Sequence, residues 1–156
     1  MYSKLKPGDL LHRSKGIVQH AGVYLGDGRV LHNKPEDGAV VTSYNQYAEG
    51  KIVNVTSTDS SDLQLLTQRL NEIIGSNQSY SLLANNCEDL ASYLIYGRIL
   101  SPQIQSTTIG GIVGGLIGKR NGNLAYGVIL GGLAGLVLSN MIRKYDYHID
   151  GHETLV

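Results

Sequence analysis

The chain has only one cysteine, Cys87, among its 156 residues. A single cysteine excludes an internal disulfide framework, and the lack of a Cys/His cluster at zinc-finger spacing argues against a structural metal. Lysine and arginine together number 13, as do aspartate and glutamate, so the formal net charge is zero. A neutral chain has no general field that would attract nucleic acid, and we therefore expect no nucleic-acid partner.

The N-terminus also lacks a long apolar run. Residues 1–9 contain nothing that resembles the hydrophobic segment of a secretory signal peptide. Export by that route is therefore not expected, and a lone thiol fits a reducing compartment such as the cytosol.

The first third of the chain has the composition of short β-strands. Residues 8–56 are rich in Val, Ile, Leu and Tyr and are interrupted by Gly, Pro and Asp. This alternation predicts five strands, at Asp9–Arg13, Ile17–Leu25, Arg29–Asn33, Ala39–Ser43 and Lys51–Thr56.

Two amphipathic helices are predicted after these strands. Capping residues at 59–62 precede leucines and isoleucines at helical spacing, and the pattern stops at Gly75. A second helix is predicted over about residues 87–96, with asparagines at 85–86 as its cap region and Gly97 as its stop. The cysteine therefore lies in the first turn of the second helix.

Residues 105–142 are apolar and rich in glycine, and the polar residues 119–123 divide them into two blocks. Glycines recur every four residues, at positions 110, 114 and 118 and again at 127, 131 and 135. This spacing lines one face of each helix with small residues and lets two backbones approach closely. We therefore predict a glycine-rich hydrophobic helical hairpin over 105–142, followed by a polar tail at 143–156.

The length of the second block favours insertion into a membrane. Leu124–Ile142 has 19 uncharged residues, close to the ~20 that span a bilayer, whereas the first block is too short. Basic residues at 119–120 and 143–144 fit the head-group region. The alternative is a hairpin buried in the protein or in a homo-oligomer, because small-residue spacing serves helix contact in either medium.

Two histidines flank a strong hairpin signal, the sequence Gly-Asp-Gly at residues 26–28. A three-residue loop places Gly22 opposite His32 and makes His20 its diagonal neighbour on the same sheet face, whereas a two-residue loop separates the histidines. We favour the three-residue loop because it gathers the apolar residues on the other face, namely Ala21, Val23, Leu25 and Leu31.

The histidine pair gives the cysteine a chemical interpretation. A cysteine attacks as a thiolate, and a helix N-terminus favours that anion and offers N–H groups to an oxyanion. A lone cysteine is also often a small buried hydrophobe, so its position alone leaves a structural role open. With the histidines, we interpret Cys87 as a nucleophile, His20 as the base that takes its proton and His32 as the imidazole that orients His20.

Three segments carry a resemblance to a known family. They are Lys6-Pro7-Gly8-Asp9-Leu10, the segment from His20 to His32, and Leu82 to Glu88, which ends in Asn86-Cys87-Glu88. Together they resemble the lecithin:retinol acyltransferase-like (LRAT-like) family, a permuted branch of the papain-like, NlpC-type thiol hydrolases. The resemblance implies an α+β fold, with an antiparallel sheet packed by helices, and the same roles for Cys87, His20 and His32. We expect no cofactor and no metal.

The chain departs from the family pattern at two points. Asp89-Leu90 stands where mammalian members usually have His-Phe, and the chain contains neither Trp nor Phe. The family sometimes gives an oxyanion role to a basic residue before the first histidine, and both Arg13 and Lys15 stand there.

We therefore predict a membrane-associated thiol acyl hydrolase or acyltransferase. Its catalytic domain, residues 1–104, faces the cytoplasm, and a Cys87 acyl-enzyme acts on phospholipid or another acyl substrate, as a phospholipase A or N-acyltransferase does. The membrane contact is assigned to 107–142, whose glycine-rich helices also allow a homo-oligomer. The alternatives are an NlpC-type cysteine peptidase or amidase and a non-enzymatic protein that perturbs membranes or oligomerises.

Overall fold

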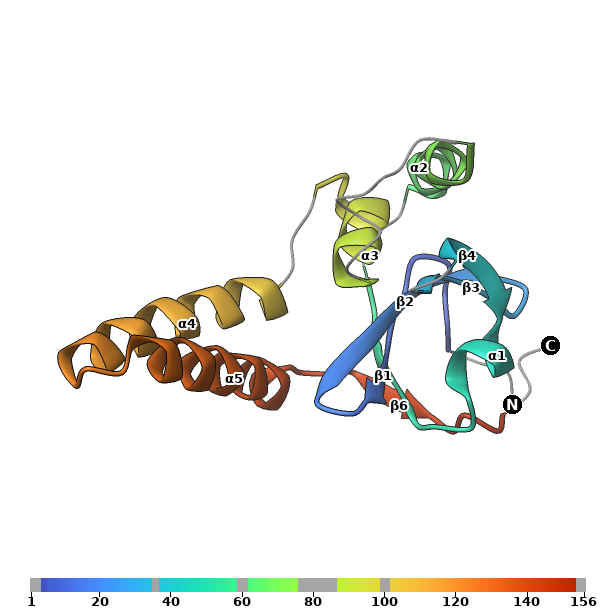
Figure 1. Cartoon of the computed structure of the whole chain (residues 1–156). Coiled ribbons are helices and arrows are strands. Elements are labelled where there is room, and N and C mark those ends of the chain that lie inside the picture. Colours follow the sequence, from blue (N-terminus) through green and yellow to red (C-terminus); the bar gives the residue numbers. More distant parts are fainter. Residues whose placement is uncertain (1–3, 35–36, 59–61, 76–86, 99–101, 154–156) are drawn as a thin grey trace. The chain divides into compact units, whose positions relative to one another are not determined.

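The computed structural model describes residues 4–34, 37–58, 62–75, 87–98 and 102–153. The chain divides into two compact units, one formed by residues 1–100 with 145–156 and the other by residues 101–144 (Figure 1).

The larger unit is built on a six-stranded antiparallel sheet with the strand order β4-β3-β2-β1-β5-β6. The strands are β1 (Leu10–Lys15), β2 (Val18–Gly26), β3 (Arg29–Lys34), β4 (Gly38–Ser43), β5 (Val53–Thr56) and β6 (Tyr147–Ile149). The five predicted strands are confirmed, each end within two residues of its expected position. Strand β6 was not predicted, because the tail was interpreted as polar as a whole, although Tyr145, Tyr147 and Ile149 alternate with polar residues.

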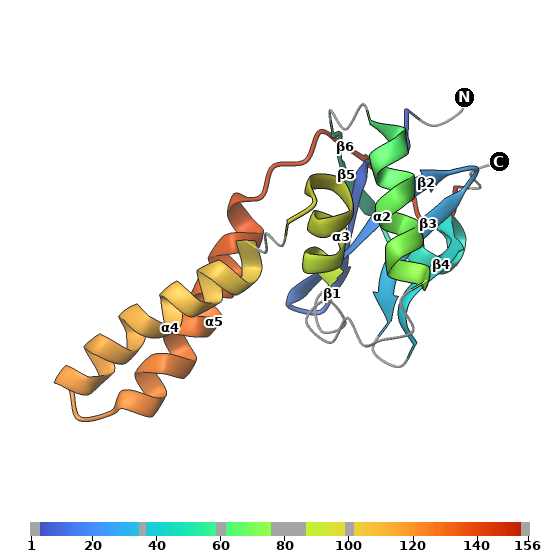
Figure 2. The same cartoon turned by 90° about the horizontal axis from the view of Figure 1, so that it is seen from above.

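Both faces of the sheet are covered, because alternate residues of a strand point to opposite sides. On one face, β1–β3 pack against α1 (Tyr44–Ala48), which contributes Tyr44 and Tyr47 to the core. On the other face, Ala21, Val23 and Leu31 pack against α2 (Leu63–Gly75) and α3 (Cys87–Tyr96), which lie over the sheet in Figure 2.

Helices α2 and α3 confirm the two amphipathic helices. Gly97 has a φ of +68°, a left-handed conformation that suits glycine and ends α3. Arg69 of α2 donates to the last carbonyls of α3, at 3.1 Å from Leu94 O and 2.7 Å from Ile95 O. The predicted cap residues 85–86 lie outside the described residues.

The turn between β2 and β3 differs from the prediction. It has two residues, Asp27 and Gly28, both with positive φ, as a type I′ hairpin turn requires. The three-residue loop is therefore wrong. A bulge between Tyr24 and Gly26 adds one residue to β2 and restores the predicted register, in which Gly22 pairs with His32.

The smaller unit consists of α4 (Pro102–Arg120) and α5 (Leu124–Ile142), which pack against each other along their length. Their glycines meet at the contact: a Cβ added at Gly114 would overlap the Gly127 carbonyl, and one added at Gly131 would overlap the Gly110 carbonyl. Only glycine allows this separation of the two backbones.

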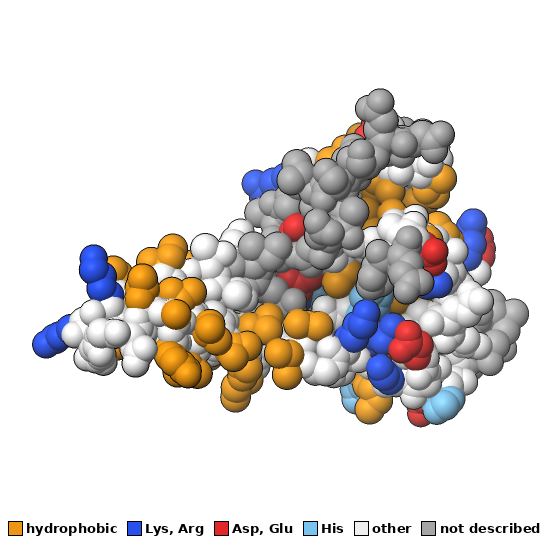
Figure 3. All heavy atoms as spheres, in the orientation of Figure 1, with side chains coloured by type: hydrophobic (Ala, Val, Ile, Leu, Met, Phe, Trp, Pro, Cys, Tyr) orange, Lys and Arg blue, Asp and Glu red, His pale blue; other side chains and the backbone are white. Residues whose placement is uncertain are grey.

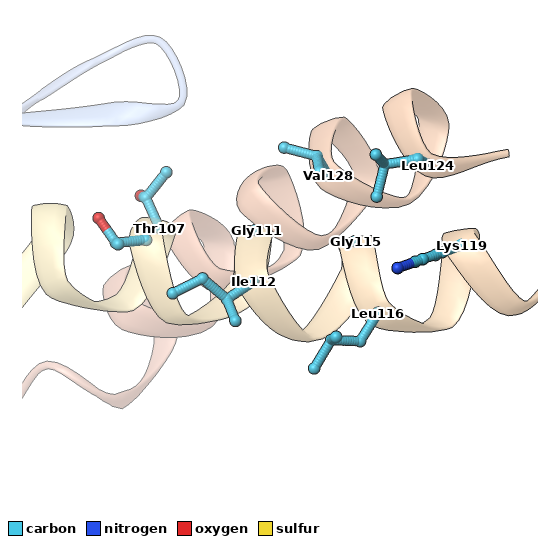
Figure 4. A pocket seen from close by; sticks show the side chains of 9 residues that line it. Thr107, Gly111, Ile112, Gly115, Leu116, Lys119, Leu124 and Val128 are labelled. Atoms are coloured by element: carbon cyan, nitrogen blue, oxygen red, sulfur yellow. The ribbon is translucent and has the colours of Figure 1, made fainter.

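The outer surface of the α4–α5 pair is apolar (Figure 3). Ile112, Leu116, Leu130 and Met141 are each at least 60% exposed. Among the described residues, α5 is the one helix long and apolar enough to cross a membrane. A groove of about 450 Å³ between the helices is also apolar, with Lys119 at one end and Thr107 at the other (Figure 4).

Candidate active site

The two predicted histidines lie together on the sheet face that α1 covers. His20 and His32 are 6% and 3% exposed, and His20 Nε2 lies 2.9 Å from His32 Nδ1. Both rings pack against the buried ring of Tyr47, with centroid separations of 5.6 and 5.3 Å. The predicted placement of both imidazoles on one face is confirmed, and Tyr47 fixes it.

A third side chain extends the histidine pair. Thr42 Oγ1 lies 3.0 Å from His32 Nε2, so Thr42, His32 and His20 form a chain of hydrogen bonds. If His32 donates to Thr42, its Nδ1 accepts from His20 Nε2 and leaves His20 Nδ1 with a free lone pair. Thr42 was not predicted from the sequence. Its signal was the register of β3 and β4, which places Thr42 diagonal to His32 on the same face.

The half-buried Cys87 contacts the main chain of β2 at the two residues that flank His20. Its Sγ accepts from Ala21 N at 3.2 Å and donates to Gln19 O at 3.6 Å. Strand β3 pairs with β2 only from Gly22 onward. The sulfur therefore lies against the edge of β2 that β3 leaves unpaired, with a contact on each side of His20.

The electrostatics of the site keep all three groups neutral at rest. Burial, followed by the Glu88 carboxylate, raises the pKa of the Cys87 thiol, although the Ala21 N–H acts in the opposite direction. The first amides of α3, those of Cys87 and Glu88, lower the pKa as expected of a helix N-terminus, but burial outweighs them and the net shift of the pKa is upward. Burial and then Arg13 lower the pKa of His20 to about 3, and burial and then Lys34 lower that of His32 to about 4.

A cleft of about 290 Å³ opens on the histidine pair. Its lining is mostly polar and charged: Arg13, Lys15, His20, His32, Asn33, Lys34, Asp37, Gln46 and Glu49. Of the three predicted site residues, the structure brings the two histidines into this cleft, whereas Cys87 is outside its lining. Within the described ranges, no three His, Cys, Asp or Glu side chains are grouped to hold a metal ion.

The buried histidines predict acid sensitivity of the fold. Their pKa values of about 3 and 4 lie below the ~6.5 of an unfolded chain, so the unfolded state takes up protons first as the pH falls. The stability that the neutral imidazoles contribute is therefore present above pH 6.5 and is lost between about pH 6.5 and 3. We expect a loss of about 1 kcal/mol per pH unit for each imidazole.

Urea unfolding at pH 7.5 and pH 4.5 measures this loss. The double variant His20→Gln/His32→Gln should lose less stability between the two pH values than the unaltered chain, because the carboxylates common to both proteins cancel. An equal loss in the two proteins would contradict the assignment.

Comparison with known proteins gives a consistent set of relatives. Residues 3–65 match the family model described as lecithin retinol acyltransferase. Phospholipase A and acyltransferase 1 of Homo sapiens is 30% identical over 119 residues, covering 62% of this chain and 71% of that protein. Phospholipase A and acyltransferase 3 of Homo sapiens is 27% identical over 134 residues, covering 71% and 83%. Lecithin retinol acyltransferase of Rattus norvegicus is 28% identical over 132 residues, covering 63% and 57%.

Proposed function

The chain belongs to the lecithin retinol acyltransferase family, and from this premise we propose that it is a thiol-dependent acyl hydrolase or acyltransferase that acts on lipid esters through a Cys87 acyl-enzyme. The observation that supports the proposal is the buried imidazole pair, in which His20 Nε2 lies 2.9 Å from His32 Nδ1, together with the contacts of Cys87 Sγ to the main chain of the two residues that flank His20.

In the first step, the sulfur of Cys87 attacks the carbonyl carbon of the ester. The thiol exchanges its hydrogen bond to the Gln19 carbonyl for one to His20, which takes the proton as the carbon–sulfur bond forms. Because thiol and imidazole are both neutral at rest, this proton moves during the attack and not before it. His32 and Thr42 hold the His20 ring and stabilise the imidazolium.

In the second step, the ester carbon–oxygen bond breaks and His20 returns the proton to the leaving alkoxide, which departs as a lysophospholipid. The acyl group remains on Cys87 as a thioester. Attack by water then gives a free fatty acid, and attack by an amine gives an amide. In both cases His20 again takes a proton from the attacking group, the carbon–sulfur bond breaks, and His20 returns the proton to the sulfur, which restores the Cys87 thiol.

We assign the finer features of the fold to the same family relationship. The sheet and its helices correspond to a permuted papain-like arrangement, with a catalytic domain over 1–104. The glycine-rich hairpin over 105–142 associates with the membrane, and the catalytic domain faces the cytoplasm. Support for the membrane role comes from the apolar outer surface of α4 and α5 and from the length of α5.

Incubation of the purified chain with phosphatidylcholine vesicles tests the proposal. We expect fatty-acid release and an acyl adduct on Cys87, detected by mass spectrometry after an acid quench. An ether-linked phosphatidylcholine, which has no ester carbonyl, serves as the matched control and should give neither product. Turnover of peptide amides without any of lipid esters would favour an NlpC-type peptidase and overturn the proposal.

A further inference from the structure

Arg13 is a buried cation at the wall of the histidine cleft. Its side chain is 5% exposed, and its guanidinium carbon lies 5.6 Å from the centre of the Tyr47 ring. One nitrogen, Nη2, donates to Glu49 Oε1 at 2.6 Å. The buried Tyr47 ring and the Glu49 carboxylate thus hold the guanidinium in one position beside His20 and His32.

The remaining donors of Arg13 are buried without a partner. Nε and Nη1 are removed from solvent, yet neither makes a hydrogen bond. A buried donor without an acceptor destabilises the fold, and it does so more strongly when it is charged. A guanidinium presents its N–H groups as a planar fork that matches the oxygens of a carboxylate or phosphate. Two buried N–H donors that lack an acceptor indicate a site for an anionic ligand.

The charge and size of the cleft agree with this indication. Its lining holds three cations, Arg13, Lys15 and Lys34, against two carboxylates, Asp37 and Glu49, which leaves an excess of one positive charge. At about 290 Å³, the cleft lies at the lower limit of the ~300–1,000 Å³ that drug-sized ligands occupy. It suits a lipid headgroup better than a whole two-chain lipid.

The position of Arg13 relative to the sulfur decides which group of the substrate it meets. Arg13 of β1 pairs with His20 of β2. The main-chain N–H and C=O groups of Tyr24 form hydrogen bonds with residues 8 and 9, on the β1 side of β2. Because these groups alternate in direction along a strand, the N–H of Ala21 and the C=O of Gln19 point away from β1, and both contact Cys87 Sγ. Arg13 and the sulfur therefore lie at opposite edges of β2. The oxyanion forms next to the sulfur, so Arg13 meets a more distant group.

We propose that Arg13 binds the phosphate of a glycerophospholipid substrate and holds its headgroup in the histidine cleft. The proposal rests on the proposed function for its substrate class. Arg13 is thereby a specificity-determining residue: it selects phosphate-bearing esters, while Cys87 and His20 act on the ester carbonyl.

A binding experiment tests the site without requiring turnover. Glycerophosphocholine is titrated into the full chain carrying Cys87→Ser and followed by NMR, including the Arg13 Nε–H resonance. We expect saturable binding that moves this resonance, and a loss of at least about tenfold in affinity with Arg13→Met. Lys51→Met is the matched control, because Lys51 also pairs with Glu49, at 3.5 Å, but lies outside the cleft lining. Absence of binding, or equal weakening by both substitutions, would overturn the proposal.

Kinetics distinguish headgroup binding from an oxyanion role. Arg13→Met should raise the KM for a short-chain phosphatidylcholine at least about tenfold more than the KM for a phosphate-free p-nitrophenyl ester. The effect of the lost charge on the pKa of His20 is common to both esters and cancels in this ratio. Arg13→Lys should recover part of the KM. An equal fall in kcat/KM for both esters would mean that Arg13 does not recognise the phosphate and would overturn the proposal. If the unaltered enzyme hydrolyses neither ester, the proposed function fails, while the binding result still judges the anion site.

Discussion

Replacement of Cys87 by serine should lower the rate of fatty-acid release by a factor of about 10³ or more. Serine has nearly the same shape and keeps a hydroxyl that can donate to the Gln19 carbonyl and accept from the Ala21 N–H. Its proton is far harder to remove, however, and the pKa of His20, about 3, makes that imidazole a weak base. The attacking atom therefore loses its reactivity while its surroundings are preserved.

The rate is measured with phosphatidylcholine vesicles, together with the melting temperature of both proteins. The adduct at position 87 should also disappear. Residual activity above about a tenth of the original, in a protein that still melts normally, would mean that the ester is cleaved without a covalent intermediate at Cys87, and the mechanism proposed above would be abandoned.

Replacement of Gly114 by alanine should separate α4 from α5. The added Cβ would overlap the carbonyl oxygen of Gly127 and lie 2.8 Å from Gly131 Cα. Both of these are backbone atoms, which cannot move away by a change of rotamer. Overpacking of this kind typically costs about 1–3 kcal/mol. We expect a lower midpoint for thermal loss of the helical circular dichroism in detergent micelles, to which the two longest helices contribute most.

Gly111→Ala is the matched control for this substitution. Gly111 lies in the same helix, and a Cβ there would meet Val128 O at 3.7 Å, an ordinary van der Waals distance. Both substitutions raise the helix propensity of α4 by the same ~1 kcal/mol. The difference between the two midpoints therefore reports the glycine contact alone. Equal midpoints would mean that the helices do not meet through Gly114.

The sequence predicted the parts of the fold that follow from local periodicity. Strands β1–β5 and helices α2 and α3 were found because their apolar residues repeat with a period of two or of about 3.6. The five-residue helix α1 is too short to show a period, although Tyr47 on it positions the histidines. Strand β6 has only three residues, too few for the alternation around it to predict a strand, and it forms by pairing with β5.

Within the site, the sequence predicted that the two histidines meet but not the shifts of their pKa values. The register of His20 and His32 follows from the apolar residues that share the opposite face of the sheet. The predicted register is therefore correct although the predicted loop length is not. The predicted direction of the net shift in the pKa of Cys87 was wrong, because the burial of the thiol depends on the packing of α3 against β2. The roles of Arg13 and Thr42 were not predicted, because they depend on contacts with residues distant in the chain, namely Glu49 and His32.

The pairing of β6 with β5 also limits how the chain can thread through a bilayer. Strand β5 precedes α4 in the sequence and β6 follows α5, yet the two strands share one sheet. The points where residues 101–144 leave and rejoin the larger unit must then be on one side of any membrane, so the number of crossings between them is even. If α5 traverses the lipid, α4 traverses it too and carries Lys119 and Arg120 to the opposite surface. A lone spanning anchor is incompatible with this topology.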